Sequence, residues 1–182
     1  SHRFNPFDFI SSDPARAAID CNVFSYQVIA DNPELKDPYW HNRARNFLWA
    51  FATMLAMSST ANFRNLTQLS RCFNMSLSRR KTKGGVVLDP KTDAILTLLA
   101  SLGTKFGIDD LEAAAGAIRG GLSNENSQRI ESVFDNARIH LSPFSRETLV
   151  QKAMAASDWH PLDFRREPGT TLYLTIPTTD IA

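Results

Sequence analysis

The residues most capable of binding a metal ion are four histidines and two cysteines, and they are widely dispersed. They are His2, His41, His140, His160, Cys21 and Cys72. Zinc sites that can be recognised in a sequence contain close pairs such as HxxxH or CxxC, because such spacing turns two ligands toward one ion. The chain contains neither pair. We therefore expect no metal site, and two isolated cysteines favour a reducing compartment over a disulfide framework.

Motifs for phosphate transfer or nucleophilic catalysis are missing as well. A phosphate-binding loop needs a Gly-Lys pair and a serine elbow needs GxSxG, and neither occurs in the chain. The run VVLDP at 86–90 has the apolar residues and aspartate that hold Mg²⁺ beside such a loop, but Pro90 directly follows Asp89. That order is typical of a helix N-cap. Asp109 and Asp110 stand at another helix start, where the helix dipole favours acidic residues. We expect no enzyme activity and no cofactor in this chain.

Charge is distributed unevenly along the chain. Residues 41–85 contain eight Lys or Arg and no Asp or Glu, although the whole chain carries a net charge of only +1. Such a stretch either forms an electropositive face or is scattered around solvated helices. The aromatic residues within it fall at helical spacing, which favours a core position. The segment SRRKTK is predicted to be a loop that reaches a partner, so the candidate partner-binding residues are Arg79, Arg80, Lys81 and Lys83.

Helical patterns dominate the middle of the chain. Asp-Pro pairs at 13–14, 37–38 and 89–90 are typical helix starts. Residues 39–58 carry a wide apolar stripe, which predicts a long helix at the centre of a bundle. Another helix is expected to bury Phe63 with Leu66, Leu69 and Phe73 on one face. Gly103 and Gly120-Gly121 are predicted to end two further helices. About seven helices between residues 13 and 156 predict an all-α domain.

The two ends of the chain have a different character. FNPFDFI near the start contains a proline that prevents a full helix, and TTLYLTIP at 170–177 has the β-branched and aromatic residues of a buried strand. A single strand cannot satisfy its own backbone groups. We therefore expect this strand to belong to a sheet outside the helical domain.

Several of these segments, taken in order, resemble type IV coupling proteins, the TraG/TraD-type ATPases of conjugation and type IV secretion. FNPFDFI is similar to that family's N-P-x-D segment, and DPYWHNRARNFLWAFATMLA to its D-P-F/Y-W helix. In the C-terminal third, the serine-rich helix start at 123–127, LSPF at 141–144, SDWHPLDF at 157–164 and TLYLTIP at 171–177 follow the family's order. The resemblance covers both ends and most of the helices.

The resemblance implies that a compact bundle of about seven helices is inserted into a RecA-like nucleotide-binding domain. Residues 1–12 would be a flank from that domain, residues 13–167 the all-α domain, and residues 168–182 the returning strand. Both flanks should then lie close together in space. The parent protein would bind ATP and Mg²⁺ and form hexamers at the cytoplasmic face of the bacterial inner membrane. This fragment lacks the nucleotide motifs and any apolar run of about 20 residues. We expect it to be a monomer, because the resemblance implies that the contacts of the hexamer lie largely in other parts of the parent protein.

In that family the all-α domain takes part in recognising substrates. The leading hypothesis is accordingly a domain that docks a secreted effector signal or a relaxosome, that is, a relaxase–DNA complex. A second hypothesis is a helical DNA-binding domain that acts through the basic 41–85 stretch. A small helical enzyme is a third alternative, against which the lack of a catalytic constellation counts.

Overall fold

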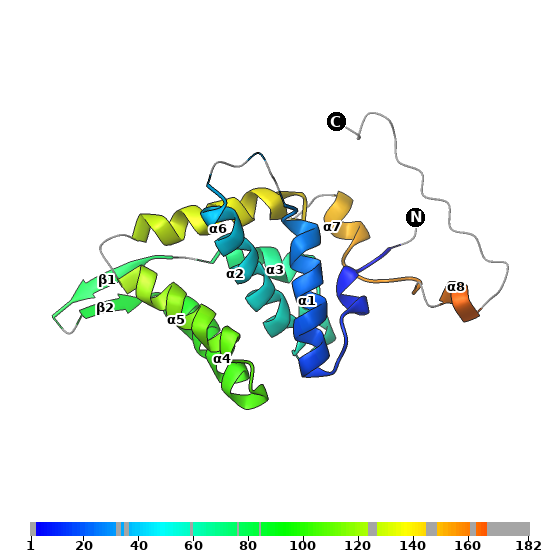
Figure 1. Ribbon diagram of the computed structural model, residues 1–182, viewed down its shortest axis with the longest axis horizontal. Coiled ribbons are helices and arrows are strands. Elements are labelled where there is room, and N and C mark those ends of the chain that lie inside the picture. Colours follow the sequence, from blue (N-terminus) through cyan, green and yellow to red (C-terminus); the bar gives the residue numbers. More distant parts are fainter. Residues whose placement is uncertain are drawn as a thin grey trace.

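A computed structural model describes residues 3–31, 34, 37–58, 60–75, 77–83, 85–123, 127–144, 149–160 and 163–166. Within these residues the fold is mostly helical, as the sequence predicts, and seven α-helices lie between Pro14 and Ala153. In Figure 1 the α4–α5 pair and a β-hairpin extend from one end of the molecule, and α7 and α8 lie toward the other. The elements are η1 (Pro6–Phe9), α1 (Pro14–Val28), α2 (Tyr39–Ala56), η2 (Ala61–Phe63), α3 (Leu66–Phe73), β1 (Arg79–Thr82), β2 (Gly85–Leu88), α4 (Pro90–Phe106), α5 (Asp109–Ser123), α6 (Ser127–Leu141), η3 (Ser142–Phe144), α7 (Leu149–Ala153) and α8 (Asp163–Arg166).

Helix α2 is the centre of the bundle, which confirms the prediction from its apolar stripe. Twelve of its eighteen residues are buried, and it packs against α1, α3, α4, α5 and α6. Four phenylalanines from α2, α3 and α6 form one cluster, in which Phe51 lies 5.2 Å from Phe73 and 6.2 Å from Phe134, and Phe47 lies 6.0 Å from Phe134, between ring centroids. Large buried aromatic side chains contribute most to such a core.

The three Asp-Pro pairs stand at helix starts, and Asp13 and Asp89 are N-caps as predicted, whereas α2 has Pro38 as its N-cap. The Asp13 carboxylate accepts a hydrogen bond from the backbone N–H of Arg16 at 2.9 Å, and Asp37 accepts from Tyr39 at 3.0 Å. Asp89 accepts from the backbone N–H groups of Lys91 and Thr92, which confirms that it caps α4.

Two predicted helix ends are wrong. Gly103 lies inside α4, which continues to Phe106 and ends at Gly107 in the left-handed conformation, with φ +66°. Gly120 and Gly121 lie inside α5, which continues to Ser123. At Gly103 the glycine serves packing, because a Cβ atom there would lie 3.0 Å from the backbone N of Glu112 and the backbone O of Ile108. The residue therefore permits close approach of α4 and α5.

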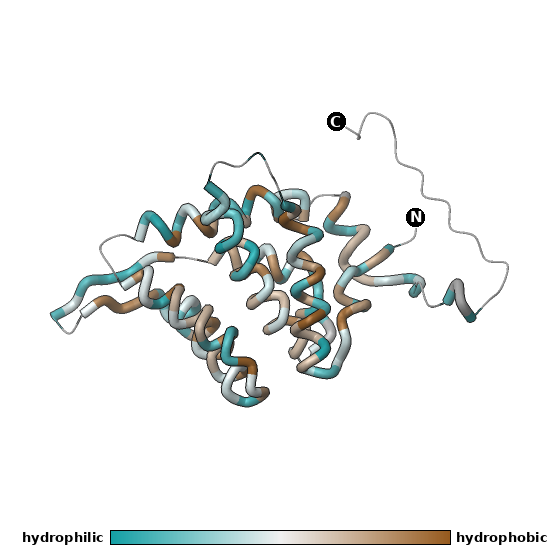
Figure 2. The backbone as a smooth tube through the Cα atoms, viewed as in Figure 1, coloured by the Kyte–Doolittle hydropathy of each residue, from teal (hydrophilic) through white to brown (hydrophobic). Residues whose placement is uncertain are grey.

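Two further predictions need correction. Phe63 does not belong to the buried face of α3; it lies in η2 and is 47% exposed, because α3 begins only after its cap Asn65. The basic SRRKTK segment is not a loop, since Arg79–Thr82 pairs antiparallel with Gly85–Leu88. Figure 2 shows the contrast between the hydrophilic β1 and the more hydrophobic β2. Basic residues carry little strand signal, so the pairing was not evident from β1 alone.

Segments from the two ends of the domain lie side by side. The backbone N–H of Phe4 donates to Ala153 O at 2.8 Å, and that of Asp158 donates to Arg3 O at 3.0 Å. Arg3 and Asp158 also form an ion pair at 2.8 Å. The predicted strand and the flank at 168–182 lie outside the described residues, so the assignment of both flanks to a second domain stays a prediction.

Replacing Gly103 with Ala should destabilise the domain, because the new methyl group meets backbone atoms of the α5 turn rather than a side chain that can move. We expect the free energy of unfolding to fall by about 1–3 kcal/mol. The matched control is Gly116→Ala in the middle of α5, where no atom lies within 4 Å of the added Cβ and where Ala should stabilise the helix by roughly 0.5–1 kcal/mol. Urea denaturation measures both effects. Equal effects of the two substitutions would contradict the packing role of Gly103.

Candidate docking surface

The structure divides the basic stretch into residues that hold the fold and residues that face solvent. The Arg45 side chain is almost fully buried; its Nε donates to Ile29 O at 3.0 Å and its Nη2 to Asp31 at 2.6 Å. Arg64 donates to Ile10 O at 3.0 Å and so ties η1 to the segment before α3. These arginines stabilise the connections around α1 and do not form a basic face.

The four candidate partner-binding residues all lie on the β-hairpin or its turn. Arg79 holds the hairpin against α5, because its guanidinium donates to the carbonyl of Leu122 at 2.5 Å. Arg80, Lys81 and Lys83 are exposed. The hairpin extends beyond the end of α5 (Figure 1), so these three cations form an accessible basic tip.

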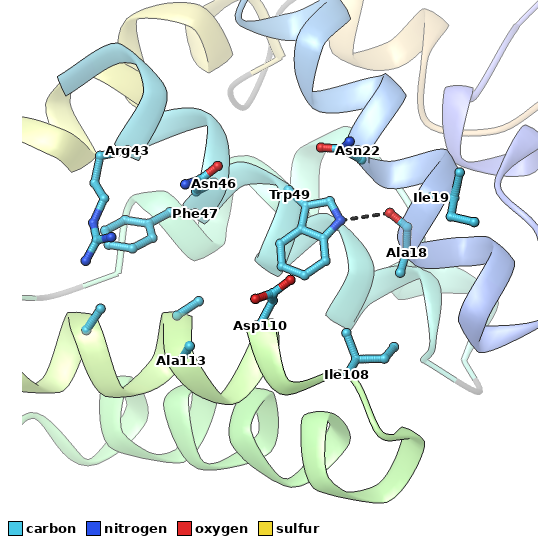
Figure 3. Close-up of a pocket in the computed structure, with 12 residues that line it drawn as sticks. Ala18, Ile19, Asn22, Arg43, Asn46, Phe47, Trp49, Ile108, Asp110 and Ala113 are labelled. Carbon is cyan, nitrogen blue, oxygen red and sulfur yellow. Dashed lines mark hydrogen bonds between the residues drawn. The ribbon is translucent and has the colours of Figure 1, made fainter. Parts of the chain in front are cut away.

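A groove of about 550 Å³ lies between α1, α2 and α5. Figure 3 shows Asn22 and Ile19 of α1 on one side, Phe47 and Trp49 of α2 at the back, and α5 along the other side. Concave surfaces that combine an aromatic floor with a few polar groups are the usual form of binding sites. The groove is therefore a candidate docking site that sequence patterns did not reveal.

The floor of the groove is fixed by a hydrogen bond between two helices. The indole Nε1–H of Trp49 donates to the carbonyl of Ala18 at 2.8 Å, as the dashed line in Figure 3 shows. This bond favours one orientation of the indole, and neighbouring Phe47 is packed in the core. The groove is thus formed before any partner binds.

The α5 side of the groove is lined by small residues. Ala113, Ala114 and Ala117 line it, and Asp110 lies at the same side. Alanines allow the backbone of a partner to approach closely. No sequence pattern singled out these residues, because Trp49 had helical core spacing and Asp110 stood at a helix start. Only the packing of α1 and α5 against α2 brings them together.

A second hollow, of about 720 Å³, lies between the N-terminal segment, α1 and the C-terminal end of α6, with Met154 also in its lining. Its lining is mostly aromatic and aliphatic, and Arg16 and Asp20 at its rim pair with each other at 2.9 Å. His140 also lines it, with its ring centroid 5.7 Å from that of His41. Burial lowers the pKa of His140, and the neighbouring His41 lowers it further. No charge pattern in this hollow selects a partner.

The described part of the chain contains neither a metal-binding cluster nor a low-pKa cysteine. No group of three or more His, Cys, Asp and Glu side chains could hold a metal ion there. Burial raises the pKa of both Cys21 and Cys72 to about 12, so neither thiol forms the reactive thiolate at neutral pH. Among the same residues, no helix has the length and hydrophobicity needed to cross a membrane.

The described residues thus form a helical fold with a groove between α1, α2 and α5 and with exposed basic residues on the hairpin. The chain belongs to the type IV secretory system conjugative DNA transfer family, whose sequence model matches residues 1–182. This agrees with the resemblance to TraG/TraD-type coupling proteins. Searches of curated protein sequences and of solved structures found no significant match.

Acid should destabilise the domain partly through His140. The pKa of His140 is lowered in the folded state. The unfolded state therefore binds more protons than the folded state once the pH falls below the pKa of a histidine in the unfolded chain, near 6.5. The contribution of neutral His140 to the free energy of unfolding is complete above that pH. It is lost as the pH falls through the pKa that His140 has in the folded state. We expect the urea midpoint to decrease between pH 7.5 and 5.5, and to decrease less in His140→Gln. An identical decrease in the variant would contradict this assignment.

Proposed function

We propose that this chain is the substrate-recognition domain of a type IV secretion coupling protein, and that it docks cargo in the groove between α1, α2 and α5. The cargo is a secreted effector protein or a relaxase–DNA complex. The observation that carries the proposal is the preformed groove, in which Trp49 is locked to Ala18 and faces a wall of alanines. A rigid concave surface of this kind binds a partner with little loss of conformational entropy.

The family membership supports this proposal, since the family as a whole serves type IV secretion and conjugative DNA transfer. In the proposed arrangement, the helical domain captures the cargo and delivers it to an ATPase motor. Nucleotide and Mg²⁺ would bind in other parts of the parent protein, which would form a hexamer at the cytoplasmic side of the inner membrane. The domain itself would be a monomer without enzyme activity.

A second candidate function is direct binding of DNA by the hairpin. It is favoured by the exposure of Arg80, Lys81 and Lys83 on an element that extends from the body. Clustered cations bind phosphate backbones with little dependence on base sequence. The groove plays no part in this alternative, so the two functions can be separated by mutation.

Cargo docking is tested by titrating the domain with candidate cargo signal segments. Ala113→Trp places a large side chain in the groove from an exposed position of α5, and we expect it to weaken cargo binding by about tenfold or more. Ala94→Trp is the control, because Ala94 is exposed on α4 and does not line the groove. Equal affinity of both variants would exclude docking in the groove. Failure of every cargo segment to bind, together with tight binding of DNA, would exclude the docking function.

Direct DNA binding predicts a strong dependence of affinity on salt. In a triple variant with Ala at Arg80, Lys81 and Lys83, the slope of log K against log salt concentration should fall by roughly 0.9 for each phosphate that the domain no longer neutralises. Arg79 is retained because it anchors the hairpin. The control is a triple variant with Ala at Lys105, Arg129 and Lys152, which are exposed outside the hairpin. It removes the same number of positive charges. If both variants bind DNA alike, the hairpin is not the DNA-binding element.

A further inference from the structure

The groove contains one acidic and one basic side chain, and they lie at different positions along it. In Figure 3, Asp110 lies beneath Trp49, whereas Arg43 lies at the other end beside Phe47. Trp49 follows Arg43 by six residues on α2, which corresponds to about 9 Å along the helix axis. This rise, about one and two thirds helical turns, separates the two positions on α2 beside which the opposite charges lie.

Each charge is accompanied by an aromatic ring. The guanidinium carbon of Arg43 lies 5.2 Å from the centroid of Phe47, which holds the cation over the groove. Asp110 extends toward the indole of Trp49 (Figure 3). An aromatic ring next to a carboxylate is a favourable environment for a cation, which gains both the ring quadrupole and the negative charge. Among the described residues neither Arg43 nor Asp110 forms an ion pair within the domain.

We propose, building on the docking function above, that the groove binds a helical cargo segment whose basic and acidic side chains are seven residues apart. The basic side chain pairs with Asp110 over Trp49, and the acidic side chain pairs with Arg43. Residues at positions i and i+7 lie on the same face of a helix, about 10 Å apart along its axis. This distance is close to the rise of about 9 Å along α2 between Arg43 and Trp49, and the cargo residues between the two charged side chains pack on Ala113 and Ala117.

The charges also argue against a nucleic acid in this groove. Asp110 shares the first turn of α5 with Asp109 and Glu112, so phosphate groups would be repelled at that end. The alanine wall suits a helix laid in a groove, which is a common way in which proteins recognise peptides. The basic hairpin lies outside the groove and is not needed for this recognition.

The test uses synthetic peptides of about 18 residues, long enough for an alanine- and glutamine-rich sequence to form a helix. Each peptide carries one Arg and one Glu, at spacing i, i+7 in one peptide and i, i+4 in the other. Binding is followed by the NMR signal of the Trp49 indole Nε1–H. We expect this signal to shift on titration, with the i, i+7 peptide binding about threefold to tenfold tighter, because each rim ion pair has a modest effect.

Charge-neutralising variants show whether the named residues set this preference. Asp110→Asn and Arg43→Gln should each remove most of the preference for the i, i+7 peptide. The matched control for the first is Asp109→Asn, which removes the same charge from the same helical turn at a residue outside the groove. The control for the second is Arg71→Gln, at an exposed position on α3. Both controls should keep the preference.

Several results would overturn the inference. It fails if the two peptides bind equally, if neither peptide binds, or if the control variants lose the preference as fully as the groove variants. It also fails if a native cargo binds Asp110→Asn and Arg43→Gln as tightly as it binds the unmodified domain, although cargo docking itself would then stand. Conversely, a spacing preference in the peptides with no binding of any native cargo would support the charge pattern and reject the docking function.

Discussion

The burial of α2 is the constraint on which the rest of the structure depends. A helix with two thirds of its residues buried can exist only if other helices cover almost its whole circumference. Helices α1, α3, α4, α5 and α6 provide that cover, and the cluster of Phe47, Phe51, Phe73 and Phe134 fills the space between α2, α3 and α6. The cover is incomplete between α1 and α5, where the groove forms.

The groove is therefore a direct product of the packing around α2. Trp49 is only partly buried. Its indole reaches α1 through the bond to Ala18, and Asn46 and Phe47 of the same helix line the groove together with residues of α5. The close contact of α4 with α5 at Gly103 holds the far wall in place. The proposed recognition surface thus consists of side chains on rigid helices, which favours a site with fixed geometry over a mobile loop.

The sequence predicted the parts of the fold that local chemistry determines. The Asp-Pro helix starts, the central position of α2 and the all-α class follow from capping and apolar spacing, which act within a few residues. Errors arose where packing or pairing with the next element of the chain decides the outcome. Gly103 continues a helix because α5 packs against it, and β1 forms because its partner strand is apolar and lies directly after the turn. The groove was unpredictable for the same reason, since its residues come from three helices.

Docking of cargo between α1, α2 and α5 is best tested by an NMR titration of the isotope-labelled domain with a cargo segment that binds. If the cargo occupies the groove, the largest shifts should occur at the Trp49 indole and at the backbone amides of Asn22, Ala113 and Ala117, with small shifts in the hairpin. Shifts confined to Arg79–Leu88, with the groove signals unchanged, would contradict docking in the groove.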